Sequence, residues 1–417
     1  MSTPNPFRLT RRQFLGAAGA TGAGLVVGCS NSQGGKGPST STTSTTTPGT
    51  FGGGSLAAGT GTLVLVTLYG GNDGLDTVVP AEDGTYQSLR GDLARSPADL
   101  LDLGDGLGFH PKLERLHQRW GAGQLAVMRA AGYPEPDRSH FRSMDIWQTG
   151  EPERAVVPGW LGRWLDAEAD RDPLRAVSIG QSIPRAMVGL SSSAAAVSLE
   201  PFEIPGGAAM ETAVAAVGDT ALSREGWGSV VAGSMGDLLT VADATGGFER
   251  STGGGPGYQG ELAASFELVA DAIAAGLPTR VYAVSTGGYD THDAQANTRD
   301  TLMEQLDAGV GGFLDRLDGD GTADDVVVLV YSEFGRRVEA NASLGTDHGK
   351  GGLTMVAGSS VSGGFYGDHP SLTDLDDGDL ASNVDFRSVY TEVLEQVLGI
   401  DPTVCLDAPQ PALGFLA

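Results

Sequence analysis

The stretch Thr62–Leu68 (TLVLVTL), followed by Tyr69-Gly-Gly-Asn72-Asp73-Gly, decides the fold class. A continuous run of β-branched and leucine residues is typical of a strand that is buried on both faces, as in a parallel sheet. The two glycines let the backbone turn sharply, so that Asp73 can face a ligand. Asn-Asp-Gly is also a common turn sequence in which the Asp only caps the next segment, and the sequence leaves both interpretations open.

Two later runs, Arg280–Val284 and Val326–Tyr331, repeat this pattern of a strand followed by glycine and polar residues. Parallel α/β sheets place their chemistry at the carboxyl ends of the strands. Carboxylates and imidazoles that converge there form the ligand set of a divalent metal site. Besides Asp73, the candidate metal ligands are Asp290, His292, Glu333, Asp347 and His348.

Helical segments alternate with the strand-like runs. Apolar residues at helical spacing predict helices over Gln259–Ala275, Asn297–Leu317 and Asp385–Leu398. Further strands are expected at Leu125–Arg129, Arg175–Ile179 and Leu353–Ala357. The order predicts an α/β fold with a mostly parallel central sheet and helices on both faces.

The spacing of the paired residues favours metal binding. Asp290 and His292 are two apart, which in extended chain puts both side chains on one side, as ligands of one metal require. Asp347 and His348 are adjacent and point in different directions, so they could serve two metals of a site that clamps the attacking and leaving oxygens. Helix caps, a surface histidine and an Asx turn are the alternative interpretations.

Three residues are candidates for catalysis. Ser139 and His140 lie before a predicted helix, Phe141–Thr149, where the electropositive N-terminus lowers the cost of an alkoxide. Serine is also a common helix cap. Arg336 could hold a tetrahedral oxyanion, and Glu333 could instead orient His292 or His348; a salt bridge between Glu333 and Arg336 is equally compatible.

Two loop histidines, His110 and His369, each precede a proline. Either could complete a metal shell, and the sequence does not choose between them.

The N-terminal region reads as an export signal. Arg11-Arg12-Gln-Phe-Leu is a twin-arginine motif, followed by a short apolar stretch that ends at Cys29 in a lipobox-like Leu-Val-Val-Gly-Cys. We therefore expect a signal peptide over residues 1–29, recognition by the twin-arginine machinery, and an extracytoplasmic protein attached to a membrane through lipidated Cys29. Residues 30–60, rich in Gly, Ser and Thr, are expected to be a disordered tether.

Composition narrows the class of partner. The net charge is −26, and no basic stripe is present to neutralise phosphates, so a nucleic-acid partner is disfavoured. The chain has 2 cysteines, and lipidation of Cys29 would leave Cys405 alone, which excludes a disulfide framework.

These motifs resemble the bacterial family called domain of unknown function 1501, whose members look like exported relatives of the alkaline phosphatase and sulfatase superfamily. The matching segments are YGGNDGLD (69–76), DRSHF (137–141), GGYDTH (287–292), SEFGR (332–336), GTDHG (345–349) and DFRSVY (385–390). The resemblance implies one alkaline-phosphatase-like domain over residues 61–417. It matches Asp73 to one metal, Asp290 and His292 to a second, Asp347 and His348 to both, and Ser139 to the nucleophile.

The expected function is metal-dependent hydrolysis of a phosphate or sulfate ester, with one or two divalent ions (zinc, calcium, magnesium or manganese). Ser139 or a water molecule would attack, and Arg336 would stabilise the equatorial oxygens. The alternative is a non-catalytic surface protein on the same scaffold that binds a partner or a polysaccharide.

Overall fold

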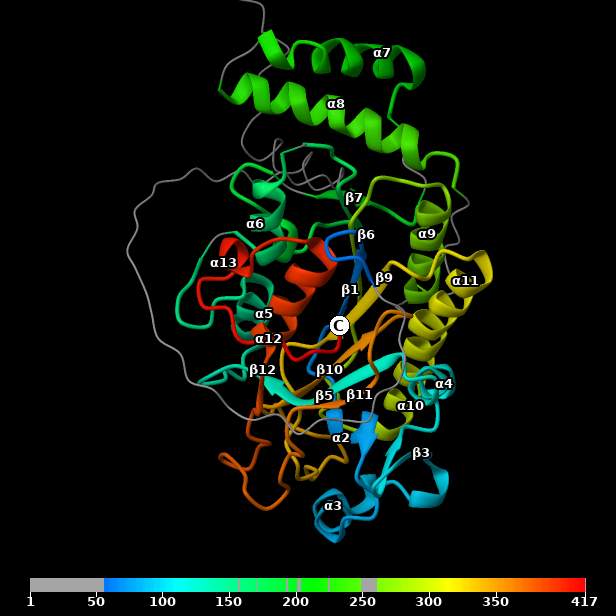
Figure 1. Ribbon diagram of the computed structural model, residues 1–417, viewed down its shortest axis with the longest axis vertical. Helices are drawn as coiled ribbons and strands as arrows, with labels where there is room; N and C mark the ends of the chain where they lie inside the picture. The colour runs from blue at the N-terminus through cyan, green and yellow to red at the C-terminus, as the bar shows by residue number, and fades with distance from the viewer. Residues whose placement is uncertain are drawn as a thin grey trace, which may run out of the picture.

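The computed structural model describes residues 56–156, 158–169, 171–192, 194–200, 204–223, 226–248 and 261–416. A large sheet at its centre has the strand order β11-β5-β10-β9-β1-β8-β6-β7, and β12 pairs with β5 (Figure 1). The strands are β1 (Thr62–Leu68), β5 (Leu125–Gly132), β6 (Ala176–Ile179), β7 (Ala195–Val197), β8 (Val281–Thr286), β9 (Val326–Tyr331), β10 (Gly352–Ala357), β11 (Gly364–Tyr366) and β12 (Val384–Asp385).

The sheet is parallel from β9 through β1, β8 and β6 to β7. Strand β10 is the exception, since it runs antiparallel to both of its neighbours, β9 and β5. Strand β5 therefore points the same way as β1. As a result, the carboxyl ends of β1, β5, β8 and β9 lie at one edge of the sheet, and the chain between β9 and β10 leaves and returns at that edge.

The strands are apolar throughout because helices cover both faces of the sheet. Along β1, Leu63 and Leu65 pack into one core, and Val64 and Val66 pack into the other. The first core contains α5 (His140–Thr149), α6 (Trp160–Ala167), α12 (Phe386–Glu392) with the π-helical Val393–Leu398, and α13 (Pro402–Cys405). The second contains α4 (Glu114–Gly121), α9 (Glu261–Ala274), α10 (Gln295–Leu306), the π-helical Asp307–Gly311 and α11 (Gly312–Asp320).

These observations confirm the predicted fold class, a mostly parallel sheet with helices on both faces. The predicted single helix Asn297–Leu317 is continuous but contains a π turn at Asp307–Gly311. Asp307 accepts hydrogen bonds there from the backbone N–H groups of Arg115 and Leu116 at the start of α4, at 3.1 and 2.9 Å.

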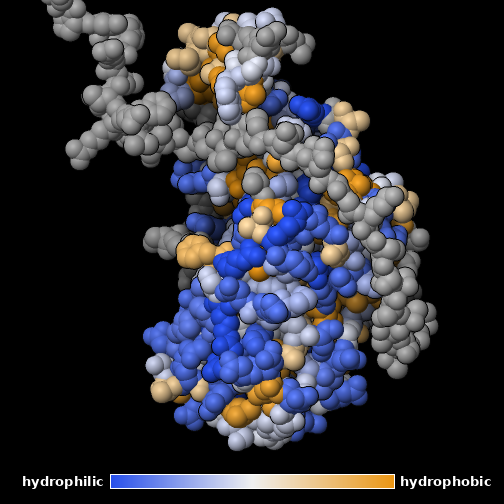
Figure 2. Space-filling model, turned by 90° about the vertical axis from the view of Figure 1, so that its left-hand side faces the viewer, coloured by the Kyte–Doolittle hydropathy of each residue, from blue (hydrophilic) through white to orange (hydrophobic). Residues whose placement is uncertain are grey.

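Two smaller units extend the molecule at opposite ends in Figure 1. Near the carboxyl edge of the sheet lie α2 (Gly74–Thr77), α3 (Gly84–Arg90) and an antiparallel sheet of β2 (Val78–Val79), β4 (Leu107–Phe109) and β3 (Leu101–Gly104). The other end carries the pair α7 (Gly207–Gly218) and α8 (Trp227–Thr245). Hydrophobic colour gathers there in Figure 2, where the side chain of Trp227 is 65% exposed.

Within the described ranges, no helix combines the length and apolarity needed to cross a bilayer. The expected signal peptide, Cys29 and most of the expected tether lie outside the described residues.

Candidate metal centre

Three loops at the carboxyl edge of the sheet bring polar side chains together. His140 begins α5 after β5, Asp290 and His292 follow β8, and His348 lies between β9 and β10. Glycine permits the close approach of these loops. A Cβ atom at Gly345 would lie 2.2 Å from the backbone carbon of His292, so a side chain at residue 345 would push the two loops apart.

Asp290, His292 and His348, three of the residues predicted to converge, lie close together. The imidazole Nε2 atoms of His292 and His348 lie 2.9 Å apart, and each is close to Asp290 Oδ1, at 2.9 and 3.1 Å. His140 joins them, with its Nε2 atom 3.4 Å from Asp290 Oδ2. Donor atoms of His140, Asp290 and His348 all lie within 4.8 Å of one another, close enough to share one ion.

The outer nitrogen of each imidazole faces an oxygen. Nδ1 of His140 contacts Glu333 Oε1 at 2.7 Å, and Nδ1 of His292 contacts Asp347 Oδ1 at 3.0 Å. Nδ1 of His348 contacts the carbonyl oxygen of Arg138 at 2.9 Å. Each oxygen can only accept, so Nδ1 carries the proton in all three rings and Nε2 presents a lone pair to the cluster.

With these tautomers, three lone pairs and a carboxylate face one another, an arrangement that a bound cation would stabilise. The buried Nε2 atom of His140 makes no hydrogen bond within the described part of the chain, as a ligand atom waiting for a metal would. His140, Asp290 and His348 suffice for an ion that keeps one position open, and His292 would add a fourth ligand. The donor set of imidazole nitrogen and carboxylate oxygen fits a divalent metal, and suits zinc well.

Asp290 is the negative centre of the cluster. Burial raises the pKa of its carboxyl, but the hydrogen bond from the Arg336 guanidinium and the charge of that group outweigh burial and lower the pKa to about 2. Burial lowers the pKa of His348, which favours the neutral imidazole that a metal requires.

Arg336 does not have the role that the sequence suggested. Its side chain is buried and donates hydrogen bonds to the carbonyl oxygens of Gly70, Gly71, Tyr289 and Thr346, besides Asp290. The guanidinium therefore fixes the β1, β8 and β9 loops relative to one another. Its donors are already used, so it is not placed to hold an oxyanion of a substrate.

Glu333 and Asp347, predicted as ligands, are instead the acceptors that orient His140 and His292. Glu333 is buried and also accepts the backbone N–H of Gly70 at 2.9 Å. Carboxylates behind ligating histidines fix the ring and make its free nitrogen a better donor. His140, predicted as catalytic, lies among the ligands. The structure thus places Glu333 behind a histidine, one of the two roles that the sequence left open for it, and places His140 beside Asp290.

The structure does not bring Asp73 into the cluster. It caps α2 and is buried in an ion pair with Arg90, whose Nη1 and Nη2 atoms lie 2.5 and 2.9 Å from its oxygens. Gln295 donates a further hydrogen bond at 2.7 Å. Burial raises the pKa of Asp73, but Arg90 outweighs it and lowers the pKa to about 2. The sequence reading of Asp73 as a ligand is thus corrected, because both oxygens already have cationic or amide partners.

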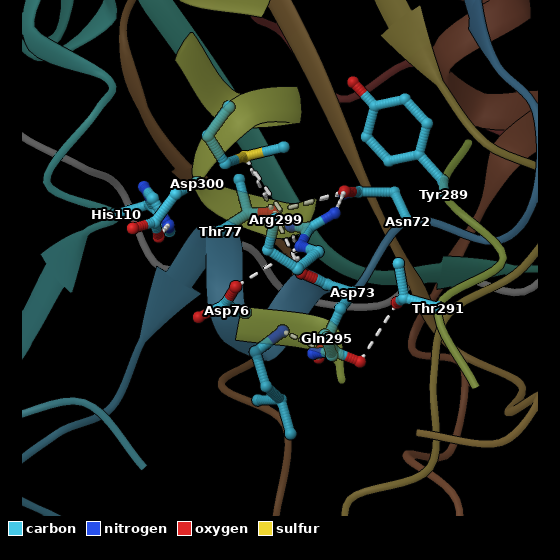
Figure 3. A network of polar contacts seen from close by, with 12 residues as sticks. Asn72, Asp73, Asp76, Thr77, His110, Tyr289, Thr291, Gln295, Arg299 and Asp300 are labelled. Carbon is cyan, nitrogen blue, oxygen red and sulfur yellow. Dashed lines mark hydrogen bonds and ion pairs between the residues drawn. The ribbon is translucent and has the colours of Figure 1, made fainter. Parts of the chain in front are cut away.

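Gln295 connects this buried ion pair to the metal loops (Figure 3). Its Oε1 atom accepts hydrogen bonds from the hydroxyls of Thr291, at 3.0 Å, and Thr346, at 2.6 Å. These threonines precede His292 and Asp347 in the chain. Asp73 therefore supports the loops of the site through Gln295, without contacting the cluster itself.

Arg299, also in Figure 3, is another residue that the sequence reasoning missed. Its fully buried guanidinium binds the side-chain oxygens of Asn72 and Thr77 at 2.7 and 3.0 Å. One sequence signal was available. Arg299 lies three residues before Leu302, on the apolar face of the predicted helix, and an arginine there implies a buried anionic or polar partner.

Neither of the two loop histidines reaches the cluster. His110 is buried and contacts Asp300 Oδ1 at 3.0 Å, and His369 contacts Arg129. Together with the position of Asp73, this leaves the described residues with donors for one metal ion and no second group of ligands.

Ser139 is exposed and adjoins the ligand His140. Its hydroxyl makes no capping hydrogen bond to α5; instead its backbone N–H donates to Asp137 Oδ1 at 2.7 Å. The cap interpretation of the serine side chain is therefore not supported.

A cavity of about 340 Å³ is lined by Tyr69 and the end of β8, which come just before two of the loops at this edge of the sheet. The residues that line it are Tyr69, Ile179, Gly180, Leu199, Glu261, Ser265, Ser285, Thr286 and Gly287. Tyr69 donates its backbone N–H to Thr286 at 2.8 Å, and Gly70 contacts Glu333, so the cavity wall and the histidine support are continuous.

A family model described as protein of unknown function (DUF1501) matches residues 61–410. The chain belongs to the DUF1501 family. The match spans every loop of the metal cluster and confirms the resemblance drawn from the motifs. Among the curated proteins, no sequence matches this DUF1501 protein.

Several solved structures are distantly similar to the DUF1501 protein. One is a protein in the alkaline phosphatase superfamily from Vibrio parahaemolyticus, with 13% identity, TM-score 0.36, and 87% of this chain and 71% of that chain covered. A second is the lipoteichoic acid synthase LtaP from Listeria monocytogenes, with 10% identity, TM-score 0.36, and 82% and 72% covered. The third is the periplasmic domain of EptC from Escherichia coli, in complex with Zn, with 9% identity, TM-score 0.38, and 73% and 76% covered. At these scores the similarity is too distant to carry information on activity.

Proposed function

We propose that the protein is a metal-dependent hydrolase of phosphate or sulfate esters, with one metal ion rather than two. The observation that carries this proposal is the common orientation of His140, His292 and His348, whose Nε2 atoms face Asp290 while each Nδ1 faces an oxygen. A divalent ion bound there would supply a Lewis acid for an ester oxygen. A cluster of imidazoles and carboxylates at the carboxyl edge of a sheet, near a cavity, is a suitable place for such chemistry.

The residues of the chain have separate tasks in this proposal. His140, Asp290 and His348 hold the ion, and Glu333 and the Arg138 carbonyl fix two of the rings. Ser139, exposed beside His140 at the start of α5, is the candidate nucleophile. The cavity next to Tyr69 would receive the alcohol part of the ester.

One observation favours the rival function, a non-catalytic surface protein. If His292 joins the other three ligands, the ion has four protein ligands, and a closed tetrahedral site is typical of structural zinc. The same scaffold would then bind a partner or a polysaccharide without turnover.

Metal analysis and an ester screen test the proposal. The protein purified without chelator should hold about one ion per chain, and His348→Ala should lose it. The metal-loaded protein should hydrolyse aryl phosphates or aryl sulfates, and Ser139→Ala should abolish turnover while leaving the melting temperature unchanged, because the hydroxyl makes no capping bond.

The outcomes separate the two functions. A protein that holds its ion but hydrolyses neither class of ester would support the surface protein. Turnover that survives in Ser139→Ala would transfer the attack to a water molecule. A protein that binds no ion would end both versions of the metal site.

A further inference from the structure

A group of basic side chains borders the metal centre of this strongly acidic chain. Arg138 lies two residues before His140, Lys350 lies two residues after His348, and Arg337 donates its backbone N–H to the carbonyl oxygen of Asp347 at 2.9 Å. The carbonyl oxygen of Arg138 accepts from His348, so this residue touches the ligand set directly. The chain has a net charge of −26, so a group of three basic residues beside the metal centre calls for an explanation.

One acidic turn covers these basic side chains. In the turn Asp376–Asp379, the two end residues exchange backbone hydrogen bonds of 3.0 and 3.2 Å. The central residues Asp377 and Gly378 have φ of +55° and +82°, which is the left-handed conformation of a type I′ turn. Asp and Gly are among the residues that tolerate this conformation, so each central residue of the turn suits its backbone angle.

The turn is bound by four ion pairs of unequal strength. Asp379 is fully buried and contacts both Arg138 and Arg337. Lys350 contacts Asp376 at 2.7 Å. Asp377 contacts Arg138 at 3.0 Å, but its side chain is 73% exposed. A buried ion pair is costly to break, whereas an exposed one contributes little, so Asp377 is the partner that another anion can replace.

The buried and exposed contacts divide the two carboxylates into different roles. Asp379 holds the arginines in place next to the metal loops. Asp377, itself exposed, contacts the same Nη2 atom of Arg138 as Asp379 does, and the side chain of Arg138 is 34% exposed. Arg336 is committed to backbone carbonyls. Arg138 is partly exposed and its carbonyl oxygen contacts His348, so its guanidinium can take an anion from solution beside the site.

We propose that the Arg138 guanidinium binds a second anionic group of the substrate and that Asp377 occupies this position in the free protein. The inference rests on the proposed function and specifies its substrate class: an ester whose alcohol part carries a further negative charge. One anionic group meets the metal centre, and the other displaces the Asp377 carboxylate from Arg138. Arginine suits this role because its planar donors match carboxylate, phosphate and sulfate.

Direct binding of inorganic phosphate, measured on the metal-free protein by NMR titration of arginine side-chain signals, tests the anion position alone. Asp377→Asn keeps the turn and removes the competing charge, and should tighten phosphate binding about threefold to fivefold, as expected for loss of one exposed ion pair. Arg138→Gln should abolish the Arg138 response and weaken binding. Arg154→Gln, which alters an exposed arginine paired with Asp407, is the matched control and should change nothing.

Kinetics on the metal-loaded protein test the substrate class. Arg138→Gln should raise KM for an aryl ester that bears an added carboxylate by a larger factor than it raises KM for the uncharged aryl ester. Equal phosphate affinity in Asp377→Asn and the unaltered protein would overturn the inference, even if Arg138→Gln failed to fold. Phosphate binding that follows expectation without hydrolysis of any ester would leave the anion position standing and refute the proposed hydrolase.

Discussion

Asp73 shows how a residue can support the loops of the candidate metal centre without reaching the cluster. Its carboxylate neutralises Arg90, and through Gln295 it is linked to Thr291 and Thr346, which flank the site. Both charges of this pair are buried, with 1% of each side chain exposed. Removal of one partner from such a pair leaves the other charge without compensation in the interior.

Asp73→Asn should therefore lower the free energy of unfolding by about 3–5 kcal/mol, the usual cost of breaking a buried ion pair. Urea unfolding followed by circular dichroism measures this loss. At saturating metal, the folded variant should still hold one ion per chain. Asp83→Asn is the matched control, since Asp83 also caps a short helix but makes no ion pair within the described residues. Because Asn caps a helix about as well as Asp does, this change should cost well under about 1 kcal/mol. Loss of the ion with little loss of stability would restore Asp73 as a ligand.

The positions of the site residues could be predicted from the sequence, but their individual roles could not. Asp290, His292 and His348 were identified because they follow strands that had to be neighbours. Whether Glu333 touches a metal or a histidine depends on a distance of 2.7 Å to His140, which strand patterns do not determine. The ion pair of Asp73 with Arg90 joins a strand end to a short helix, and nothing in the local sequence of either marks the other.

At the scale of elements, the predictable part was the parallel core. The runs at 62–68 and 326–331 are strands as predicted, because uninterrupted apolar β-branched residues allow little else. The antiparallel direction of β10 was not predicted, since a short apolar run looks the same in either direction. The π turns inside the α10–α11 and α12 segments were also missed, because they depend on packing and on Asp307 binding α4.

His110 joins the small sheet to α10 and should make stability depend on pH. The backbone N–H of Lys112 donates to its Nδ1 atom at 3.1 Å, so Nε2 carries the proton toward Asp300. Burial lowers the pKa of His110 from 6.5 to about 4, despite the nearby Asp76. The folded state thus favours the neutral ring, and its stabilisation is present above pH 6.5 and is lost as the pH falls toward 4.

The expected loss over this range is about 2–3 kcal/mol for the single histidine. Urea unfolding at several pH values between 7.5 and 4 measures it. His110→Asn retains an amide donor and acceptor but does not titrate, so its stability should vary less over the same range. Parallel curves for the two proteins would show that His110 does not carry the effect.

At the scale of the whole molecule, the site requires a finished fold. Its ligands lie at 140, 290, 292 and 348 in the sequence and meet only when the sheet has formed. A protein that takes up its ion after folding, and before leaving the cytoplasm, needs an export route for folded chains. We propose that the twin-arginine motif at Arg11 and Arg12 provides it and that Cys29 anchors the exported protein.

Replacement of both Arg11 and Arg12 by Lys should retain the protein in the cytoplasm, as cell fractionation would show. Arg8→Lys changes a nearby arginine outside the motif and should leave export intact. Cys29→Ala should release the exported protein from the membrane fraction. Normal export of the double variant contradicts the proposed route, and membrane attachment of Cys29→Ala contradicts the lipid anchor.

Because β10 runs antiparallel to β9, the segment between them is a single insertion that connects two neighbouring strands. Antiparallel neighbours need no crossover connection. This segment therefore starts and ends on adjacent strands, which lie about 5 Å apart in a sheet. It carries Glu333, Arg336, Asp347 and His348, together with the basic residues Arg337 and Lys350. Replacing this whole segment by that of a relative should therefore exchange the residues of the candidate metal site and the neighbouring basic residues together. The order of the strands in the sheet should stay the same.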